Sequence, residues 1–444
     1  MEARKRRKSN KGQDMISDLP DFITGRILSF LPTRDAVRTS VLSKSWKRRW
    51  TFITVLHFED RHSKKIRKTF FMNFVYMVLL RLNSSNIQSF SLAISDKYEP
   101  YHVDQWIFAV LSRRVKKLCV NSEKKQQTLF SHSIMRYKSL EELVLNVNWN
   151  IKVPTFACFS FLTVLNMSGI KFQNDPSNSS GKIHLDFPVL TTYETENCTW
   201  PSTVKCVTLK VPLLKMVSIR DFQGWSPYDA DTYPVIKFCA SCLTKFTYKG
   251  YLFPYTIVFD LSVAAIASAI IDICRYQYVE ENVQEAVALS SKLLKQLKNV
   301  KSLEFKWSKK VLPFAKDSPE DLSTFEKLSH LELEEVTDQI LLAFLHKTPI
   351  LKTLILKGLL QVDQELLNYD LVHDCFLTTL QVVKFWSFDG SKHQLNFAKF
   401  VMANGVALKR MSFISTWELR KFNLEEVKEK LFSFKKCDYH GFVL

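Results

Sequence analysis

A chain of 444 residues, 46% hydrophobic and 24% charged, can bury a large core and is too apolar to be an extended disordered protein. Its 10 glycines form no GxGxxG or GxxxxGKS/T loop, which disfavours nucleotide chemistry. The net charge of +18 is uneven, since residues 1–68 hold 18 Lys and Arg against 7 Asp and Glu. No signal peptide opens the chain, and no apolar run reaches the roughly 20 residues of a membrane span. We therefore expect a folded intracellular protein, nuclear or cytoplasmic, with no membrane among its partners.

The first 13 residues are predicted to form a disordered basic tail. A run of five consecutive cationic residues in it is typical of a nuclear import signal or of an arm that binds phosphates: Arg4, Lys5, Arg6, Arg7 and Lys8. A solvated tail with no partner explains the same residues equally well. The run is therefore a candidate import signal.

Residues 14–60 are predicted to form three short helices. Apolar residues recur on one face of the first helix, which is bounded by prolines and should run about three turns. Thr33 and Ser43 are placed to cap a second and a third helix, and the third carries Trp46 and Trp50. So small a bundle cannot cover all its apolar side chains, and it therefore needs a partner or a neighbouring domain.

The sequence LPDFITGRILSFLPTRDAVRTSVLSKSWKRRW, from Leu19 to Trp50, resembles the F-box of plant-type F-box proteins. The shared features are the L-P opening, the I-L-S-x-L-P centre, the D-A-V-x-T-S-V-L-S-K run and the two tryptophans. The resemblance implies that these helices bind the Skp adaptor and, through it, a cullin ubiquitin ligase. The apolar positions that it assigns to adaptor binding are Leu19, Pro20, Ile23, Ile27, Leu28, Leu31, Pro32, Val41, Leu42 and Trp46. For any one of them, a role only in holding the helices together stays open.

Residues 61–86 are predicted to contain one helix, from Lys64 to Leu82. One face of this helix would carry Ile66, Phe70, Phe74, Met77, Val78 and Leu82. Such a helix would serve as a rigid linker that holds a bound substrate at a set distance from the F-box. A helix that caps the open end of the first repeat is the alternative.

Residues 87–370 are predicted to form a repeat array. The pattern apolar-x-x-apolar-x-apolar recurs, mostly every 22 to 29 residues, from Ile87, Val115, Leu140, Leu162, Leu190, Leu214, Leu243, Val300, Leu328, Leu351, Leu380 and Leu408. One interval is about twice as long, and the degenerate stretch Ser268–Ile273 fills it. Each unit should give one strand, with apolar positions in the core and x positions on the concave face. A strand at Leu328–Leu333 and a helix at Asp338–His346 make one such unit. This spacing is typical of leucine-rich repeats.

The C-terminal segment, residues 371–444, continues the repeat period. Three of its stretches are similar to the FBD domain that follows the repeats in plant F-box proteins: Asp374–Leu377, Val383–Phe385 and Leu408–Met411. A final surface helix is expected from Asn423 to Lys436. The predicted fold class is thus α/β: a small three-helix F-box, then an irregular leucine-rich-repeat solenoid, or horseshoe, closed by an FBD-type segment.

No catalytic residue, metal ligand or cofactor is predicted. Cys239 and Cys242 form a single Cys-x-x-Cys with no second pair at zinc-ligand spacing, so packed thiols are the favoured interpretation. No cysteine is identifiable as one that a lowered pKa would activate to carry ubiquitin as a thioester. We therefore predict a non-catalytic subunit.

The F-box resemblance implies a substrate-recognition adaptor of a Skp-cullin-F-box ligase, whose repeats bind a protein substrate for ubiquitination. The candidate substrate-binding residues are charged or ionisable x positions of the strands: Lys116, Lys117, Glu141, Glu142, Lys215, Lys245, Lys301, Glu304, His330, Glu332, Lys352 and Lys384. Both signs of charge occur there, which favours a protein partner over a nucleic acid. A nucleic-acid-binding repeat protein that uses the basic N-terminal region is one alternative, and a repeat scaffold not engaged with a ligase is another.

Overall fold

The computed structural model describes residues 19–60, 65–95, 97–122, 129–130, 137–222, 234–250, 255–261, 266–274, 283–307, 322–361, 374–388, 390–415 and 442–443. The candidate import signal at residues 4–8 and the helix expected at 423–436 lie outside these residues. The chain divides into two compact units, Met1–Lys152 and Val153–Leu444. Unit 1 combines the predicted helical module and linker helix with the first predicted repeats.

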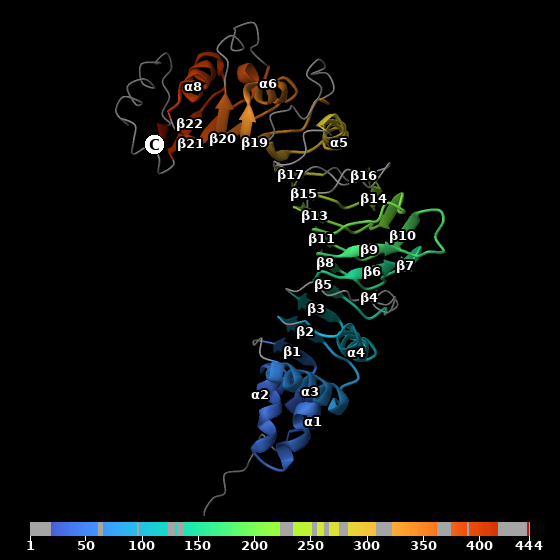
Figure 1. Cartoon of the computed structure of the whole chain (residues 1–444). Helices are drawn as coiled ribbons and strands as arrows, with labels where there is room; N and C mark the ends of the chain where they lie inside the picture. Colours follow the sequence, from blue (N-terminus) through green and yellow to red (C-terminus); the bar gives the residue numbers. More distant parts are fainter. Residues whose placement is uncertain are drawn as a thin grey trace, which may run out of the picture. The chain divides into compact units, whose positions relative to one another are not determined.

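Unit 1 begins with short helices (Figure 1): α1 (Asp21–Leu28), α2 (Thr33–Arg38), and the 3-10 helices η1 (Thr39–Val41) and η2 (Ser45–Phe52). α1 packs closely on η2 because it has a glycine at the contact. A Cβ on Gly25 would lie only 2.5 Å from the carbonyl oxygen of Phe52. The two helices could therefore not approach so closely with any larger residue at this position.

The helix ends differ from their predicted forms. α1 has 8 residues, fewer than predicted, because the amides of Phe30 and Leu31 donate to carbonyls three residues back and tighten the turn. Thr33 does not cap α2, and its hydroxyl accepts a hydrogen bond from the amide of His57 at 2.7 Å. Ser43 does not cap η2 either, because its hydroxyl is hydrogen-bonded to that of Ser45 at 2.7 Å.

Four parallel strands follow in unit 1: β1 (Val55–Asp60), β2 (Ser89–Ile94), β3 (Lys117–Ser122) and β5 (Glu142–Asn146). α3 (Lys65–Arg81) connects β1 to β2, and α4 (Pro100–Leu111) connects β2 to β3, as crossover helices do between parallel strands. The short strand β4 (Leu129–Phe130) pairs with β6 (Asn150–Val153). The helix predicted as a linker or a cap therefore connects two neighbouring strands of one unit.

The buried side of α3 differs in part from the predicted face. Val78 and Leu82 are buried as predicted, together with Val75 and Leu79, whereas Phe70 is 69% exposed. The helix packs on both β1 and α4. Two neighbours, rather than one, therefore decide which of its side chains are buried.

Unit 2 contains a long ladder of parallel strands: β8 (Val164–Ser168), β11 (Thr192–Glu196), β13 (Met216–Asp221), β15 (Lys245–Gly250), β17 (Ser268–Ile273), β18 (Ser302–Trp307), β19 (His330–Thr337), β20 (Thr353–Gln361), β21 (Val382–Phe388), β22 (Arg410–Ser415) and β23 (Phe442–Val443). Each pairs with the next in parallel. The predicted mixed α/β class, with a large sheet of parallel strands, is confirmed.

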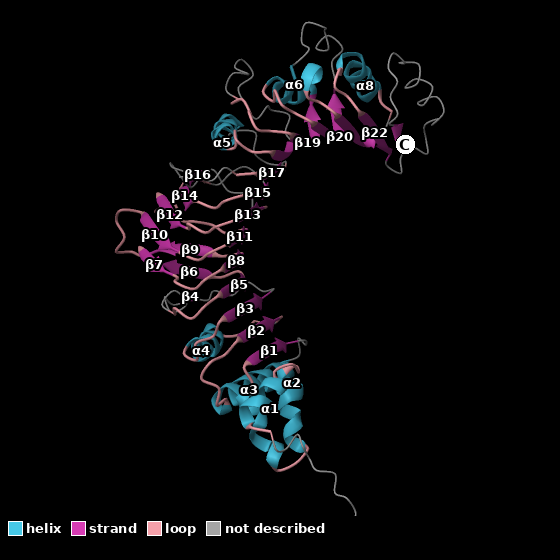
Figure 2. Cartoon of the chain, turned by 180° about the vertical axis from the view of Figure 1, so that it is seen from behind, coloured by secondary structure: helices cyan, strands magenta, loops and turns pink. Residues whose placement is uncertain are grey.

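The segments that connect one ladder strand to the next contain strands in the first part of unit 2 and helices in the later part. Up to β16 they include a second parallel sheet of β7 (Phe156–Cys158), β10 (Lys182–Asp186), β12 (Cys206–Lys210), β14 (Val235–Ala240) and β16 (Thr256–Leu261), and the short strand β9 (Lys171–Asn174). Later returns contain α5 (Val283–Gln296), α6 (Asp338–His346), α7 (Asp374–Thr378) and α8 (Lys392–Asn404). Figure 2 shows strands beside β8 to β15 and helices beside β19 to β22. The predicted helix at 338–346 is confirmed, whereas the second sheet was not predicted.

The repeat pattern coincides with the ladder. At each of the twelve predicted starts, a strand begins two residues later, and the three apolar positions of every copy are at most 8% exposed. Two further copies are in phase with these. One starts at Ile53 and leads into β1, and the other starts at Ile266 and leads into β17. The pattern therefore begins at residue 53 rather than 87, and the degenerate copy begins two residues before the predicted Ser268.

Candidate functional site

Large apolar side chains are exposed on the N-terminal helices of unit 1. They are Phe22, Ile27, Phe30, Leu31, Val41 and Leu42, and Phe30 and Val41 are the most exposed, at 86% and 84%. Clusters of this kind on a soluble protein mark a surface that binds another molecule. We call these six residues the helix surface.

The structure divides the ten residues predicted to bind the adaptor into three groups. Six are exposed: Pro20, Ile27, Leu31, Pro32, Val41 and Leu42. Leu19, Ile23 and Trp46 are half-buried. Leu28 is only 3% exposed and belongs to the core of unit 1, so it is not available to a partner. Phe22 and Phe30 are also exposed but are missing from the predicted set. The sequence feature that could have indicated both is a large apolar residue in a helix too small to bury it.

A buried arginine fixes the helices that carry this surface. Arg49 is 5% exposed, and its guanidinium donates to the Thr24 hydroxyl at 3.3 Å and to the Ser45 carbonyl at 3.2 Å. The same guanidinium lies 5.3 Å from the centre of the Trp46 ring, within the range of a cation–π contact. Trp46 therefore has a structural role as well as a partly accessible ring. Sequence reasoning assigned no role to Arg49 or Thr24.

A hydrogen bond also joins the end of α1 to the segment before β1. The Ser29 hydroxyl donates to the carbonyl of Gly25 at 2.8 Å and accepts from the amide of Thr54 at 2.9 Å. Together with the bond from the His57 amide to Thr33, this ties α1 and α2 to the first strand. The helix surface is thus carried by a rigid element, as a binding site requires.

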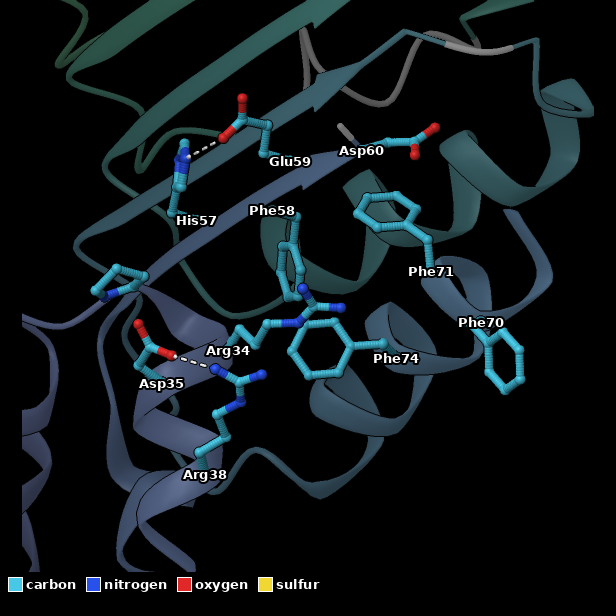
Figure 3. Close-up of a pocket in the computed structure, with 11 residues that line it drawn as sticks. Arg34, Asp35, Arg38, His57, Phe58, Glu59, Asp60, Phe70, Phe71 and Phe74 are labelled. Carbon is cyan, nitrogen blue, oxygen red and sulfur yellow. Dashed lines mark hydrogen bonds and ion pairs between the residues drawn. The ribbon is translucent and has the colours of Figure 1, made fainter. Parts of the chain in front are cut away.

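A cavity of about 620 Å³ lies between α2, β1 and α3 (Figure 3). Its lining combines aromatic rings and charged groups: Pro32, Arg34, Asp35, Arg38, His57, Phe58, Glu59, Asp60, Phe70, Phe71 and Phe74. Arg38 lies 3.2 Å from Asp35 in an ion pair, and the His57 ring lies 3.9 Å from the carboxylate of Glu59. Such a lining suits an apolar group with a polar end, and Pro32 is the one residue that it shares with the predicted adaptor-binding set.

The residues predicted to bind a substrate all occupy x positions of the ladder. Lys117, Lys215, Lys245, Lys301 and Lys352 are exposed, and the other seven are half-buried: Lys116, Glu141, Glu142, Glu304, His330, Glu332 and Lys384. The first four in sequence lie in unit 1 and the remaining eight in unit 2. The twelve residues are thus divided between the two units.

Several of these charges neutralise each other across neighbouring strands. Lys116 lies 2.7 Å from Glu141, and Lys117 lies 2.6 Å from Glu142. Glu332 is paired with Lys357, a residue outside the predicted set, and this hydrogen bond raises the pKa of the Lys357 ammonium. Ion pairs that stay in contact with solvent contribute about 0–1 kcal/mol each, so the pairs of Lys116 and Lys117 affect the charge of the face more than its stability.

Among the residues that the structure describes, every cysteine with a shifted pKa has it raised. Burial raises the pKa of both Cys198 and Cys375 to about 12, and it also raises the pKa of Cys239. Cys239 and Cys242 are both free thiols. Nucleophilic or metal-binding cysteines instead have lowered pKa values. Within the described ranges, no three His, Cys, Asp or Glu side chains gather in a way that could hold a metal ion.

None of the helices described is long and apolar enough to cross a membrane. The longest, α3, has 17 residues and includes charged ones.

Comparison with known families finds one domain in the N-terminal part of the chain and another in the C-terminal part. Residues 16–54 match the F-box domain, and residues 370–413 match the FBD domain. The chain thus has both an F-box and an FBD domain, and the resemblance to plant-type F-box/FBD/LRR-repeat proteins predicted from the sequence is confirmed.

Three similar proteins of Arabidopsis thaliana are each named for an F-box and LRR repeats, and two of them also for an FBD. The chain is 28% identical to F-box/FBD/LRR-repeat protein At3g14710, over 98% of this chain and 95% of that protein. It is also 28% identical to F-box/LRR-repeat protein At4g14096, over 78% of this chain and 74% of that protein. A third relative, F-box/FBD/LRR-repeat protein At2g04230, is 30% identical over 50% of this chain and 51% of its own length.

Proposed function

We propose that this chain is the substrate-recognition adaptor of a Skp-cullin-F-box ubiquitin ligase. The observation that carries the proposal is the exposed helix surface within the matched F-box, residues 16–54. A three-helix element that leaves Phe30, Val41 and Leu42 in water is poorly explained as a free-standing unit. Docking on the Skp adaptor removes these side chains from water.

The energetics of such docking are favourable. Complete burial of one large apolar side chain contributes about 1.5–3 kcal/mol, and the helix surface offers six of them. Only part of this sum becomes affinity, because association costs several kcal/mol in lost freedom of motion. Leu28 is excluded from the docking set because it is already buried.

We further infer that the ladder is an irregular leucine-rich-repeat solenoid, closed by the FBD segment, and that its x positions receive a protein substrate. The period of the pattern and the strand that begins two residues after every copy support this inference. The F-box would fix the chain to the ligase while the repeats hold a substrate near charged ubiquitin. Proximity alone then accelerates transfer, and no catalytic group is needed in this chain.

Recovery of a Skp adaptor by the intact chain tests the proposal. We expect the wild-type chain to retain the adaptor and Val41→Glu/Leu42→Glu to lose it, because both residues are exposed and the buried core is left unchanged. Leu80→Glu is the matched control, since Leu80 is 81% exposed on α3 and does not belong to the helix surface. Equal recovery by all three proteins, or recovery by none, would contradict the adaptor function.

A further inference from the structure

The outer face of β21 and β22 combines an exposed tryptophan with cationic side chains. Val383 and Phe385 point into the core, so Val382, Lys384 and Trp386 lie on the opposite face of β21. The register places Trp386 beside Ile414 and Val382 beside Arg410. Trp386 and Ile414 are 43% and 36% exposed. We call these residues the tryptophan patch: Val382, Lys384, Trp386, Arg410 and Ile414.

The exposure of Trp386 is unusual among the tryptophans described. Trp50, Trp106, Trp149 and Trp307 are at most 3% exposed. The half-buried rings have partners as well, since Trp46 contacts Arg49, and Trp200 stacks on Phe172 with 4.0 Å between ring centres. Within the described part of the chain, no aromatic or cationic group covers the Trp386 ring. Accessible tryptophans are strongly enriched among the residues that dominate binding energy at protein interfaces.

The charges around Trp386 differ from those on the preceding strands. On β18 to β20, glutamates and lysines pair with each other: Lys306 lies 2.5 Å from Glu334, and Lys357 is paired with Glu332. On β21 and β22, the outward positions include Lys384 and Arg410 and no acidic residue. The described residues form no ion pair with either cation. The tryptophan patch therefore combines an apolar centre with two cations that are not paired with any described residue.

We propose that the tryptophan patch binds an acidic segment of a protein, with an apolar side chain against Trp386 and carboxylates near Lys384 and Arg410. This proposal rests on the adaptor function proposed above, and it assigns the tryptophan patch to substrate recognition. A nucleic acid fits less well, because the valine and isoleucine offer phosphates no donor. The glutamates on β18 and β19 would also repel a polyanion that extended along the ladder.

Selection from a random peptide library on the full chain, bound to the Skp adaptor, tests the patch. We expect enriched peptides to combine Asp or Glu with one large apolar residue. Trp386→Ala should lower the affinity for the enriched peptide at least about tenfold, as the loss of a hot-spot residue does. Lys384→Glu and Arg410→Glu should each lower the affinity for this peptide several-fold and make that affinity less dependent on salt concentration. These two charge reversals leave the buried side of the sheet unchanged, so they test the patch without relying on the tryptophan variant.

Matched controls come from exposed residues elsewhere in unit 2. Phe161→Ala and Lys171→Glu change an exposed aromatic and an exposed lysine and should leave peptide affinity as in the wild type. Enrichment of no peptide, of peptides without acidic residues, or of peptides that bind every variant equally would overturn the assignment. So would a mixed-sequence single-stranded oligonucleotide that binds the wild type and loses affinity with Trp386→Ala, while no peptide does.

The same proteins separate failure of the patch from failure of the proposed function. Recovery of the Skp adaptor by Trp386→Ala should equal that of the wild type, because the patch lies outside the F-box. If the wild-type chain recovers no adaptor, the ligase function fails. Selection on the chain alone then still decides whether the patch binds acidic peptides.

Discussion

Leu28 and Phe30 lie two residues apart at the end of α1, yet one is 3% exposed and the other 86%. The helical periodicity placed both near one apolar face, but α1 ends at Leu28 and the tightened turn carries Phe30 away from the core. Sequence patterns locate an amphipathic helix well and its last turn poorly. The exposed apolar residues of the F-box helices could therefore be predicted as a region, while the division between core and surface required the structure.

The buried bond between Thr24 and Arg49 gives a prediction at this scale. Thr24→Val keeps the shape of the side chain and removes one acceptor from a buried guanidinium. We expect a loss of about 1–3 kcal/mol in the local free energy of opening, measured by hydrogen exchange of the α1 amides. Ser43→Ala, which removes an exposed hydroxyl bond, is the control and should change this free energy little. Equal exchange in wild type and Thr24→Val would show that this bond does not hold α1.

Cys375 gives a prediction of pH dependence. Burial raises the pKa of its thiol from 9.0 to about 12, so the folded chain holds this proton more tightly than the unfolded chain. The associated stability is present below pH 9.0 and is lost as the pH rises toward 12. We expect alkylation of Cys375 at mildly alkaline pH to be much slower in the folded chain than in urea, as measured by mass spectrometry. Similar rates in both states would mean that the thiol is accessible.

At the scale of elements, the ladder strands were predictable and their return segments were not. Each ladder copy has three buried apolar positions at a fixed spacing, and even Tyr193 and Thr195 are buried where the pattern is imperfect. The strands of the second sheet are short and bury from one to three apolar residues each, such as Val207 and Leu209 on β12. A signal this short does not separate a strand from a loop. The copy at Ile53 was missed because the F-box resemblance already covered the residues just before it.

Gly25 tests the packing of α1 on η2. Gly25→Ala would place a Cβ 2.5 Å from a backbone oxygen, so we expect a loss of about 1–3 kcal/mol from overpacking. Weaker recovery of the Skp adaptor should accompany it, because the helix surface would be distorted. The control is Arg26→Ala on the exposed side of α1. Unchanged hydrogen exchange and adaptor recovery in Gly25→Ala would contradict this packing.

At the scale of the whole molecule, we assign two binding surfaces to two different units. The helix surface belongs to unit 1 and the tryptophan patch to unit 2. Substitutions in two surfaces that share no residue are expected to act independently of each other. Val41→Glu/Leu42→Glu should therefore abolish adaptor binding and leave the affinity for the selected peptide unchanged, while Trp386→Ala should do the reverse. Fluorescence anisotropy with the labelled peptide, beside adaptor recovery, measures both.

The most direct test of the adaptor function is a calorimetric titration of the intact chain with a Skp adaptor at several temperatures. We predict saturable binding with a negative change in heat capacity, the mark of buried apolar surface. Val41→Glu/Leu42→Glu should abolish the heat of binding, and Leu80→Glu should not. No binding by the wild-type chain, or equal affinity in all three proteins, would contradict the account.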